Sequence, residues 1–142
     1  IFLEAAGNGG FLSANYERLF KVKGNLNFGI RIGLSTYCLN DYTANFNPDI
    51  IVPLGINGLY GKKHKLLIGV GQTITSIPRA STKDWKPERE ISVHANFMIG
   101  YRYQKNTGGI MLSLSYTPMV EFYKHYRHWG AAAIGYAFKS KK

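Results

Sequence analysis

Large apolar side chains alternate with small or polar ones along most of this chain. In residues 26–35 the even positions carry Leu, Phe, Ile, Ile and Leu, and the odd positions carry Asn, Gly, Arg, Gly and Ser. A period of two residues puts these two sets on opposite faces of a β-strand. The same alternation predicts six long strands, at residues 26–37, 50–60, 66–77, 91–104, 109–119 and 129–138.

The N-terminal stretch has two interpretations. Its apolar side chains occupy odd positions before a glycine-rich segment and even positions after it. Within that segment, Asn8-Gly9 is a strong signal for a two-residue hairpin turn, which would join strands at 1–6 and 11–20 with Leu3 opposite Ala14. One long strand with a glycine bulge would change the parity in the same way, so both interpretations stay open.

With the hairpin, the chain has eight strands and connections of two kinds. Short turns alternate with long loops, the turns at 21–25, 61–65 and 105–108 and the loops at 38–49, 78–90 and 120–128. This arrangement is typical of outer-membrane barrels, and an even strand count puts both termini at the short-turn end. We therefore expect one all-β domain over residues 1–142, an eight-stranded antiparallel up-and-down transmembrane β-barrel.

Charged side chains avoid the predicted strands. Of 18 basic and 8 acidic residues, only Arg31 and Arg102 fall within the six long strands, and both share a face with Gly, Ser, Asn and Thr. A barrel in water needs a charged outer face, which neither face of these strands supplies. Both faces are explained if the large aliphatic side chains contact lipid and the small ones pack inside a narrow barrel. No apolar run reaches the 18 or so residues that a transmembrane helix needs.

Four charged residues fall on the small-residue face by parity, and charge inside a barrel has to be paired. We expect a lumenal polar cluster in which Glu4 and Glu17 pair with Arg31 and Arg102. Polar side chains on the same face complete the predicted cluster: Asn15, Asn27, Asn57, His94 and Asn96. Eight strands leave an interior that side chains fill, so we expect a structural plug and no conducting pore.

Most of the net charge of +10 belongs to the short-turn end. The lysines of this predicted basic rim occur without any acid among them: Lys21, Lys23, Lys62, Lys63, Lys65, Lys105, Lys139, Lys141 and Lys142. Contact with lipid phosphates or with an acidic partner would use such a rim, and simple solubility of exposed turns is the alternative. We expect no nucleic-acid partner, because no surface combines basic and aromatic residues in the way that nucleic-acid recognition requires.

Aromatic residues concentrate near the ends of the predicted strands. The predicted aromatic belt consists of Tyr16, Tyr60, Tyr101, Tyr103, Tyr116, Trp129, Tyr136 and Phe138. Amphipathic rings favour the two interfaces of a bilayer, which supports a membrane-spanning barrel. Ordinary packing within the sheet is the alternative for some of them.

Several segments resemble small outer-membrane β-barrel proteins of Bacteroidota. They are Leu3-Glu4-Ala5-Ala6-Gly7-Asn8-Gly9-Gly10, Ser13-Ala14-Asn15-Tyr16-Glu17-Arg18-Leu19-Phe20 and Ile99-Gly100-Tyr101-Arg102-Tyr103-Gln104. The closing Ile134-Gly135-Tyr136-Ala137-Phe138 is similar to the aromatic-ended last strand of such barrels, although residues 139–142 continue past the final Phe.

The resemblance implies a barrel in a bacterial outer membrane with periplasmic termini, and it implies no reaction and no cofactor. Its partners would be outer-membrane lipid, lipopolysaccharide and other outer-membrane proteins, since some small barrels are accessory subunits of larger assemblies. The small side chains of 131–133 and Gly58 would permit close packing against such a partner. No secretion signal precedes Ile1, so we expect a mature or trimmed chain.

Three functions are therefore considered. The first is a non-catalytic barrel with a structural or accessory role. The second is a lipid A-modifying enzyme that would use Ser35 or Ser76 with His125 and His128, although no local motif pairs them. The third is a soluble lipocalin-like carrier with an apolar calyx, which needs a polar outer face that this sequence scarcely has. We expect no metal site at the two loop histidines and no reactivity at Cys38.

Pro53 fits a regular barrel least well. It falls in the middle of a predicted strand that should donate hydrogen bonds to both neighbours, and proline has no backbone N–H. We therefore expect a bulge or a strand end at this position.

Overall fold

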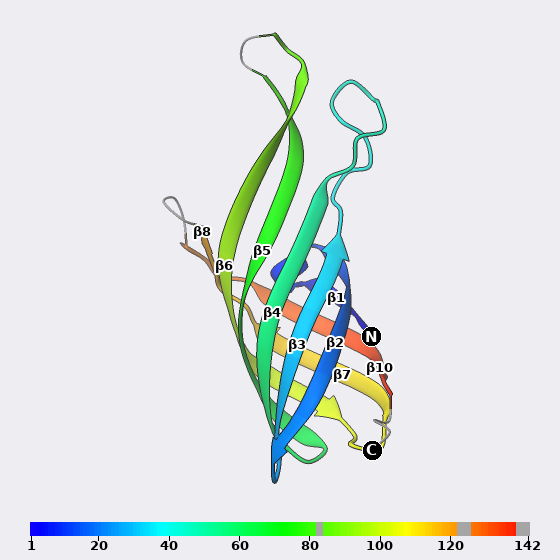
Figure 1. Ribbon diagram of the computed structural model, residues 1–142, viewed down its shortest axis with the longest axis vertical. Helices are drawn as coiled ribbons and strands as arrows, with labels where there is room; N and C mark the ends of the chain where they lie inside the picture. Colours follow the sequence, from blue (N-terminus) through cyan, green and yellow to red (C-terminus); the bar gives the residue numbers. More distant parts are fainter. Residues whose placement is uncertain (82–83, 122–125, 139–142) are drawn as a thin grey trace.

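The computed structural model describes residues 1–81, 84–121 and 126–138. Their elements, shown in Figure 1, are strands joined by turns, with one short 3-10 turn, η1. The bounds are β1 Phe2–Ala6, η1 Gly7–Gly9, β2 Leu12–Lys23, β3 Leu26–Ser35, β4 Ile50–Gly61, β5 His64–Ala80, β6 Pro87–Gln104, β7 Gly109–Tyr116, β8 Met119–Glu121, β9 Tyr126–Arg127 and β10 Gly130–Ala137.

Eight of these strands close into a ring. Each strand from β1 to β6 pairs antiparallel with the next, β7 pairs with β10, and β10 pairs with β1. The short β8 follows β7 after two residues and pairs with the upper part of β6, and β9 pairs with β8. The all-β fold and the eight-stranded antiparallel up-and-down barrel predicted from the alternation are confirmed.

The two faces of each strand divide as their side chains predict. The large aliphatic side chains lie on the outside of the barrel, where Ile32 and Leu114 keep 50% and 65% of their surface exposed. The glycine, serine and asparagine rows lie inside, and Asn57 is 2% exposed. A few apolar side chains also fill the lumen, and Leu59, Leu67 and Met98 form an apolar cluster there.

The first connection is a hairpin, but its turn differs from the prediction. Leu3 lies opposite Ala14, as expected, and this excludes the single bulged strand. The prediction of a two-residue turn at Asn8-Gly9 was wrong, because Gly7–Gly9 form a buried 3-10 turn that folds into the upper lumen. The hydroxyl of Thr73 donates to Asn8 O at 2.7 Å, so β5 holds the turn from the opposite wall.

Pro53 lies in the middle of β4 with neither a bulge nor a strand end, so that prediction was wrong. Its register with β5 is regular. Pairing between β3 and β4 is interrupted from Ile32–Leu54 to Ser35–Ile51, with the same register on both sides. The missing hydrogen bonds therefore fall on the β3 side alone. On that side Gly33 of β3 leaves room for the proline ring, because any side chain at position 33 would place its Cβ only 2.8 Å from the Pro53 ring.

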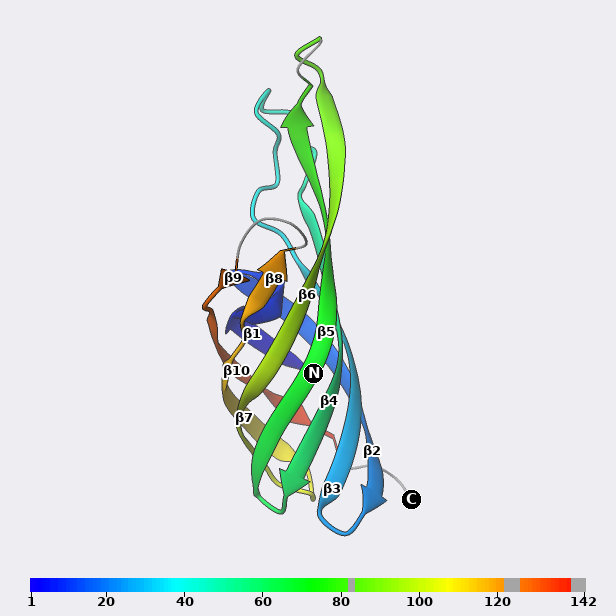
Figure 2. The same cartoon turned by 90° about the vertical axis from the view of Figure 1, so that its left-hand side faces the viewer.

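The barrel wall is uneven in height. β5 and β6 have 17 and 18 residues, whereas β7 and β10 have 8 each and β1 has 5. Figures 1 and 2 show β5 and β6 continuing as a two-stranded arm above the barrel, beside the loop between β3 and β4. The short turns lie at the opposite, lower end. The N-terminus lies at about mid-height of the barrel, and not at the short-turn end as the even strand count predicted; there Ile1 N donates to Tyr136 O at 3.1 Å.

Candidate functional site

Two ion pairs are buried in the lumen. Arg31 Nη1 on β3 lies 2.8 Å from Glu4 Oε2 on β1, with both side chains at most 3% exposed. Arg102 Nη1 on β6 donates to Glu17 Oε2 on β2, and this pair is also buried. Neither pair joins neighbouring strands of the ring. Glu17 on β2 and Arg102 on β6 tie opposite parts of the wall together, whereas Glu4 on β1 and Arg31 on β3 bridge the intervening strand β2.

The ring of Phe2 lies between the two arginines. Its centroid is 5.9 Å from Arg31 Cζ and 5.7 Å from Arg102 Cζ, within the range of a cation–π contact. The sequence interpretation missed this residue, although Phe2 shares its parity with Glu4 and so belongs to the lumenal face. Two arginines, two glutamates and one aromatic ring thus form the centre of the plug.

The asparagines of the predicted cluster surround these pairs unevenly. Asn57 Nδ2 donates to the Glu17 carboxylate. Asn96 Nδ2 donates to Thr73 Oγ1 at 3.0 Å, and Asn15 Nδ2 donates to Ser13 Oγ at 2.9 Å. All three asparagines are buried.

Two members of the predicted cluster lie nearer the ends of the lumen. Asn27 is half-buried opposite Lys21 and Leu59, close to the lower turns. His94 is half-buried opposite Thr73, in the upper part of the barrel. Neither residue has a hydrogen bond to Glu4 or Glu17 among those described.

Lys65 differs from the predicted basic rim. It is 2% exposed and points into the lower lumen, where its Nζ donates to Asn106 Oδ1 at 2.8 Å and to Gly61 O at 3.4 Å. The reason is parity, since Lys65 shares the inward face with Leu67. The other rim lysines that the structure describes are exposed: Lys21, Lys23, Lys62, Lys63 and Lys105. Lys139, Lys141 and Lys142 lie outside the described residues.

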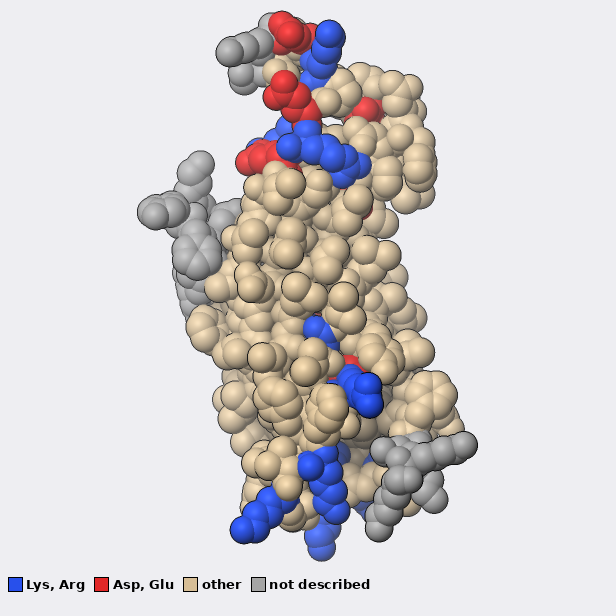
Figure 3. Space-filling view, in the orientation of Figure 1, with Lys and Arg blue, Asp and Glu red and all other residues tan. Residues whose placement is uncertain are grey.

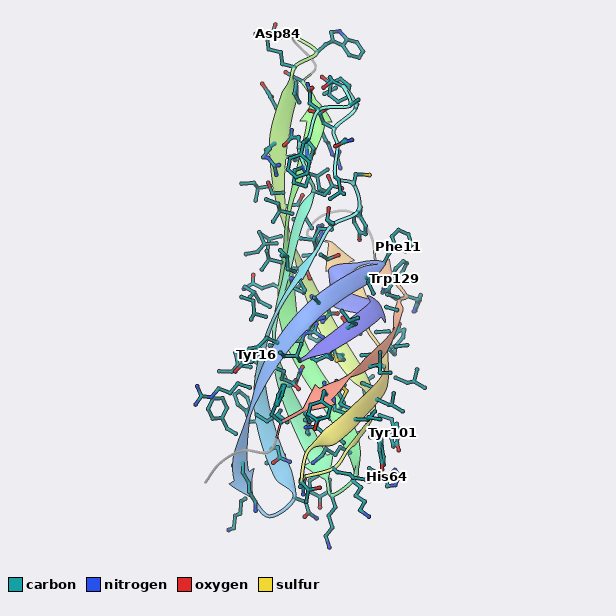
Figure 4. All side chains as sticks on the ribbon, turned by 90° about the vertical axis from the view of Figure 1, so that its right-hand side faces the viewer. Phe11, Tyr16, His64, Asp84, Tyr101 and Trp129 are labelled. Carbon is teal, nitrogen blue, oxygen red and sulfur yellow. The ribbon has the colours of Figure 1, made fainter. Side chains whose placement is uncertain are left out.

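Residues of the predicted aromatic belt lie at several heights: in Figure 4, Trp129 is near the upper end of the barrel, Tyr101 is near the lower end, and Tyr16 lies between them. At the lower end the His64 ring hydrogen-bonds Tyr101 Oη, and its centroid lies 5.5 Å from that of the Tyr103 ring with the two planes inclined by 58°. At the upper end Trp129 lies 6.4 Å from Phe11 in an edge-on contact. Tyr103 and Trp129 are half-buried, and the other belt residues are exposed: Tyr16, Tyr60, Tyr101, Tyr116, Tyr136 and Phe138.

The upper loops are joined by one arginine. Arg89 on β6 donates from Nη2 to Asn47 Oδ1 at 2.6 Å and to Pro48 O at 2.9 Å. Its Nη1 donates to Ser76 Oγ at 3.2 Å. The loop between β3 and β4 is therefore fixed against the β5–β6 arm.

Two ionisable groups of this loop have shifted pKa values. Hydrogen bonds from Thr43, first from its hydroxyl, lower the pKa of the exposed Asp41 carboxyl. Burial, and then the charge of Asp49, raise the pKa of Tyr37. Both shifts follow from local contacts within the loop.

Of the residues considered for catalysis, those that the structure describes hydrogen-bond separate groups. The hydroxyl of Ser35 donates to Leu12 O, Ser76 receives a hydrogen bond from Arg89, and His128 hydrogen-bonds Tyr116. His125 lies outside the described residues. Within the described ranges no three His, Cys, Asp or Glu side chains lie close enough to hold a metal ion.

A shallow apolar hollow lies on the outer surface of the short wall. It measures about 750 Å³ and is lined by residues of β1, β6, β7 and β10, including Ala5, Tyr101, Leu114 and Ala132. Ala132 faces this hollow, whereas Ala131 is buried. The predicted patch of small side chains at 131–133 is therefore only partly exposed on the outer surface.

No protein family, curated protein or solved structure matches this chain. No helix of the described residues is long and apolar enough to cross a membrane.

Proposed function

We propose that this protein is a non-catalytic outer-membrane β-barrel that serves as a structural or accessory subunit of a larger outer-membrane complex. The observation that carries the proposal is the inverted distribution of polarity. Large aliphatic side chains cover the outside of the closed barrel, and ion pairs and asparagines fill its inside. In water, each exposed apolar Å² would cost roughly 25 cal/mol, and hydrocarbon contact removes that cost.

The dimensions of the wall support a membrane location. β3 has 10 residues and β4 has 12. At about 3.3 Å per residue and a tilt near 40°, such strands cover roughly the 25 Å apolar band of an outer-membrane barrel. Where neighbouring strands pair around the ring, they also satisfy the backbone hydrogen bonds that hydrocarbon cannot satisfy.

The charge distribution supports an orientation. Figure 3 shows basic side chains at the lower end, both signs on the upper arm, and a largely uncharged surface between them. Short lysine-rich turns on one side and long loops on the other agree with periplasmic turns and extracellular loops. The segments that resemble Bacteroidota barrels favour the same location.

The lumen supports a role without transport. Two ion pairs and the Phe2 ring occupy its centre, so the proposal includes no conducting path. The hollow at Ala132 and Leu114 on the short wall offers a place where a neighbouring membrane subunit packs closely. A lipid A-modifying activity is not proposed, because no serine–histidine pair forms among the described residues.

The test has two steps. Purified protein is folded into phospholipid vesicles and floated on a density gradient, and its migration on a denaturing gel is compared before and after boiling. We expect flotation with the lipid and a boiling-dependent shift, and recovery in the lipid-free fraction would contradict the membrane location. The protein is then extracted from its native membrane in mild detergent. Elution with larger companions supports the accessory role, and elution only as a monomer opposes it.

A further inference from the structure

The lower part of β2 has a free edge. β1 pairs with β2 only from Phe2–Asn15 to Ala5–Leu12. At Ile1 both backbone groups hydrogen-bond Tyr136 on β10, with N–O distances of 3.1 and 2.9 Å. From Tyr16 to Lys23, β2 therefore has β3 as its neighbour on one side and no paired strand on the other in the described chain.

The direction of the backbone groups follows from the turn. Ala6 N donates to Phe11 O at 2.8 Å, so Phe11 points its backbone groups toward β1. Backbone groups alternate sides along an antiparallel strand, and residues of the same parity point the same way. Glu17, Leu19 and Lys21 therefore aim their N–H and C=O groups at the open side.

A cavity accompanies this edge. A space of about 260 Å³ lies beside Ile1, and its lining includes Tyr16, Glu17 and Leu19 on β2, Met111 on β7 and Tyr136 near the end of β10. Figure 4 shows β2 descending past Tyr16 and diverging from the short β1. The barrel wall thus has a lateral slot, which we call the β2 slot and define by Ile1, Tyr16–Lys23 and Tyr136.

The charge around the β2 slot is positive. Arg18, Lys21 and Lys23 are exposed on β2, and Arg18 lies over the Phe20 ring at 5.4 Å. The acid of the slot, Glu17, is already paired with Arg102. An occupant that carries carboxylates complements this edge.

We propose that the β2 slot receives an extended, acidic segment of another polypeptide, which adds as a strand antiparallel to β2 and continues the line of β1. The β1–β2 ladder already sets the register that such a strand extends. The proposal rests on the proposed membrane function, because hydrocarbon does not satisfy the free backbone groups of Glu17 and Leu19, whereas water does.

The experiment uses the full chain, first in detergent micelles and then in phospholipid vesicles. The probe is a synthetic heptapeptide of alternating Val and Glu, acetylated and amidated at its ends. Amide hydrogen exchange is read by NMR at Glu17 and Leu19. We expect saturating peptide to slow both amides by about tenfold or more and to leave the paired amide of Asn15 unchanged.

Two control peptides define the mode of binding. The same peptide with Lys in place of Glu should protect the amides much less. A peptide with methylated backbone nitrogens should give no protection, since it cannot donate to the β2 carbonyls. Equal protection by the methylated peptide, or no protection by the Glu peptide, would overturn strand addition.

A charge reversal tests the specificity. Arg18→Glu should weaken the binding of the Glu peptide and strengthen the binding of the Lys peptide. Lys21→Glu provides a second charge reversal if the first variant folds poorly. Arg79→Glu on the upper arm is the matched control and should leave both peptides unaffected. If Glu17 and Leu19 are already protected in vesicles without peptide, lipid or a closed wall fills the slot and the proposal fails.

The two proposals fail separately. Flotation of the vesicles reports membrane insertion, and the detergent experiment reports strand addition. Insertion without peptide protection would remove the β2 slot as a docking site and leave the membrane function standing. Peptide protection in detergent without insertion into vesicles would leave strand addition standing and remove the membrane function.

Discussion

The lumen and the outer wall are built from the same strands, and they hold their side chains in opposite ways. In the lumen, Arg31 and Arg102 are 1% exposed, and each has a carboxylate partner. On the wall, Ile32 and Leu114 keep half or more of their surface exposed and need no partner within the chain. Lumenal substitutions should therefore affect stability in every solvent, whereas the effect of wall substitutions should depend on what surrounds the barrel.

The largest effect is expected from Arg31→Leu, which leaves the Glu4 carboxylate buried without its cation. Removing one partner of a buried ion pair costs about 3–5 kcal/mol. Urea unfolding of the refolded protein measures this loss. Arg79→Leu is the matched control, because its pair with Glu90 is more than half exposed and should contribute less than about 1 kcal/mol. Similar stabilities for the two variants would show that the lumenal pair does not hold the barrel.

A wall substitution should have a large effect only in lipid. Ile32→Lys places a charge on the middle of the outer face, and we expect a loss of about 2–4 kcal/mol in vesicles. Ile32→Ala is the control for the lost side-chain volume. Folding free energies from vesicle titrations in urea give the comparison, and equal losses for Lys and Ala would contradict lipid contact at this position.

The buried turn should be sensitive to a single methyl group. Gly7 has a φ of 82°, and a Cβ there would lie 2.6 Å from Glu4 Oε1. Gly7→Ala therefore combines an unfavourable backbone with a clash at the ion pair, and we expect a loss of about 1–3 kcal/mol by thermal unfolding. Gly24 also has a positive φ but has open space around it, so Gly24→Ala separates the backbone strain from the clash. Equal losses would exclude the clash.

A smaller effect is expected at the ring between the arginines. Phe2→Leu keeps an apolar side chain but removes both cation–π contacts, which should cost about 1–2 kcal/mol. In the Arg31→Leu background the same substitution should cost less, because one contact is already absent. A double-mutant cycle in urea measures this coupling, and strict additivity would argue against the contact.

The smallest effect concerns the upper loop and pH. Hydrogen bonds from Thr43 lower the pKa of Asp41 in the folded protein, so this carboxylate stabilises the loop at pH values above its unfolded pKa. That contribution is lost as the pH falls through the lower, folded pKa. The protection factors of the Thr43 and Asn45 amides, which correct for the pH dependence of intrinsic exchange, should fall in acid, and Asp41→Asn should remove this pH dependence. Unchanged protection factors in acid would contradict this role.

The alternation of side chains along the chain was sufficient to predict the barrel fold and the charged residues of its lumen. Because side chains in a strand alternate strictly, parity placed Glu4, Glu17, Arg31 and Arg102 on the inner face before any contact was known. It also predicted the pairing of Leu3 with Ala14. Which acid meets which arginine depends on strand tilt and ring closure, and parity does not contain that information.

The errors at Lys65, Pro53 and Asn8 have separate physical causes. Lys65 was assigned to a turn, but β5 begins at His64 and so places Lys65 on the inward face. Pro53 was expected to interrupt its strand, but its missing donor faces one neighbour only, and Gly33 leaves room for its ring. Composition does not predict a turn that folds inward at Asn8, because the space it fills exists only after the barrel closes.

Contact between the outer wall and hydrocarbon is tested most directly by NMR of methyl groups in vesicles. A lipid-bound spin label and a water-soluble one are added in turn, and signal loss is compared between the outward methyls of Ile32, Ile68 and Leu114 and the inward methyls of Leu59 and Leu67. The account predicts that the lipid-bound label broadens the outward methyls and spares the inward ones. Broadening of the outward methyls by the water-soluble label instead would contradict it.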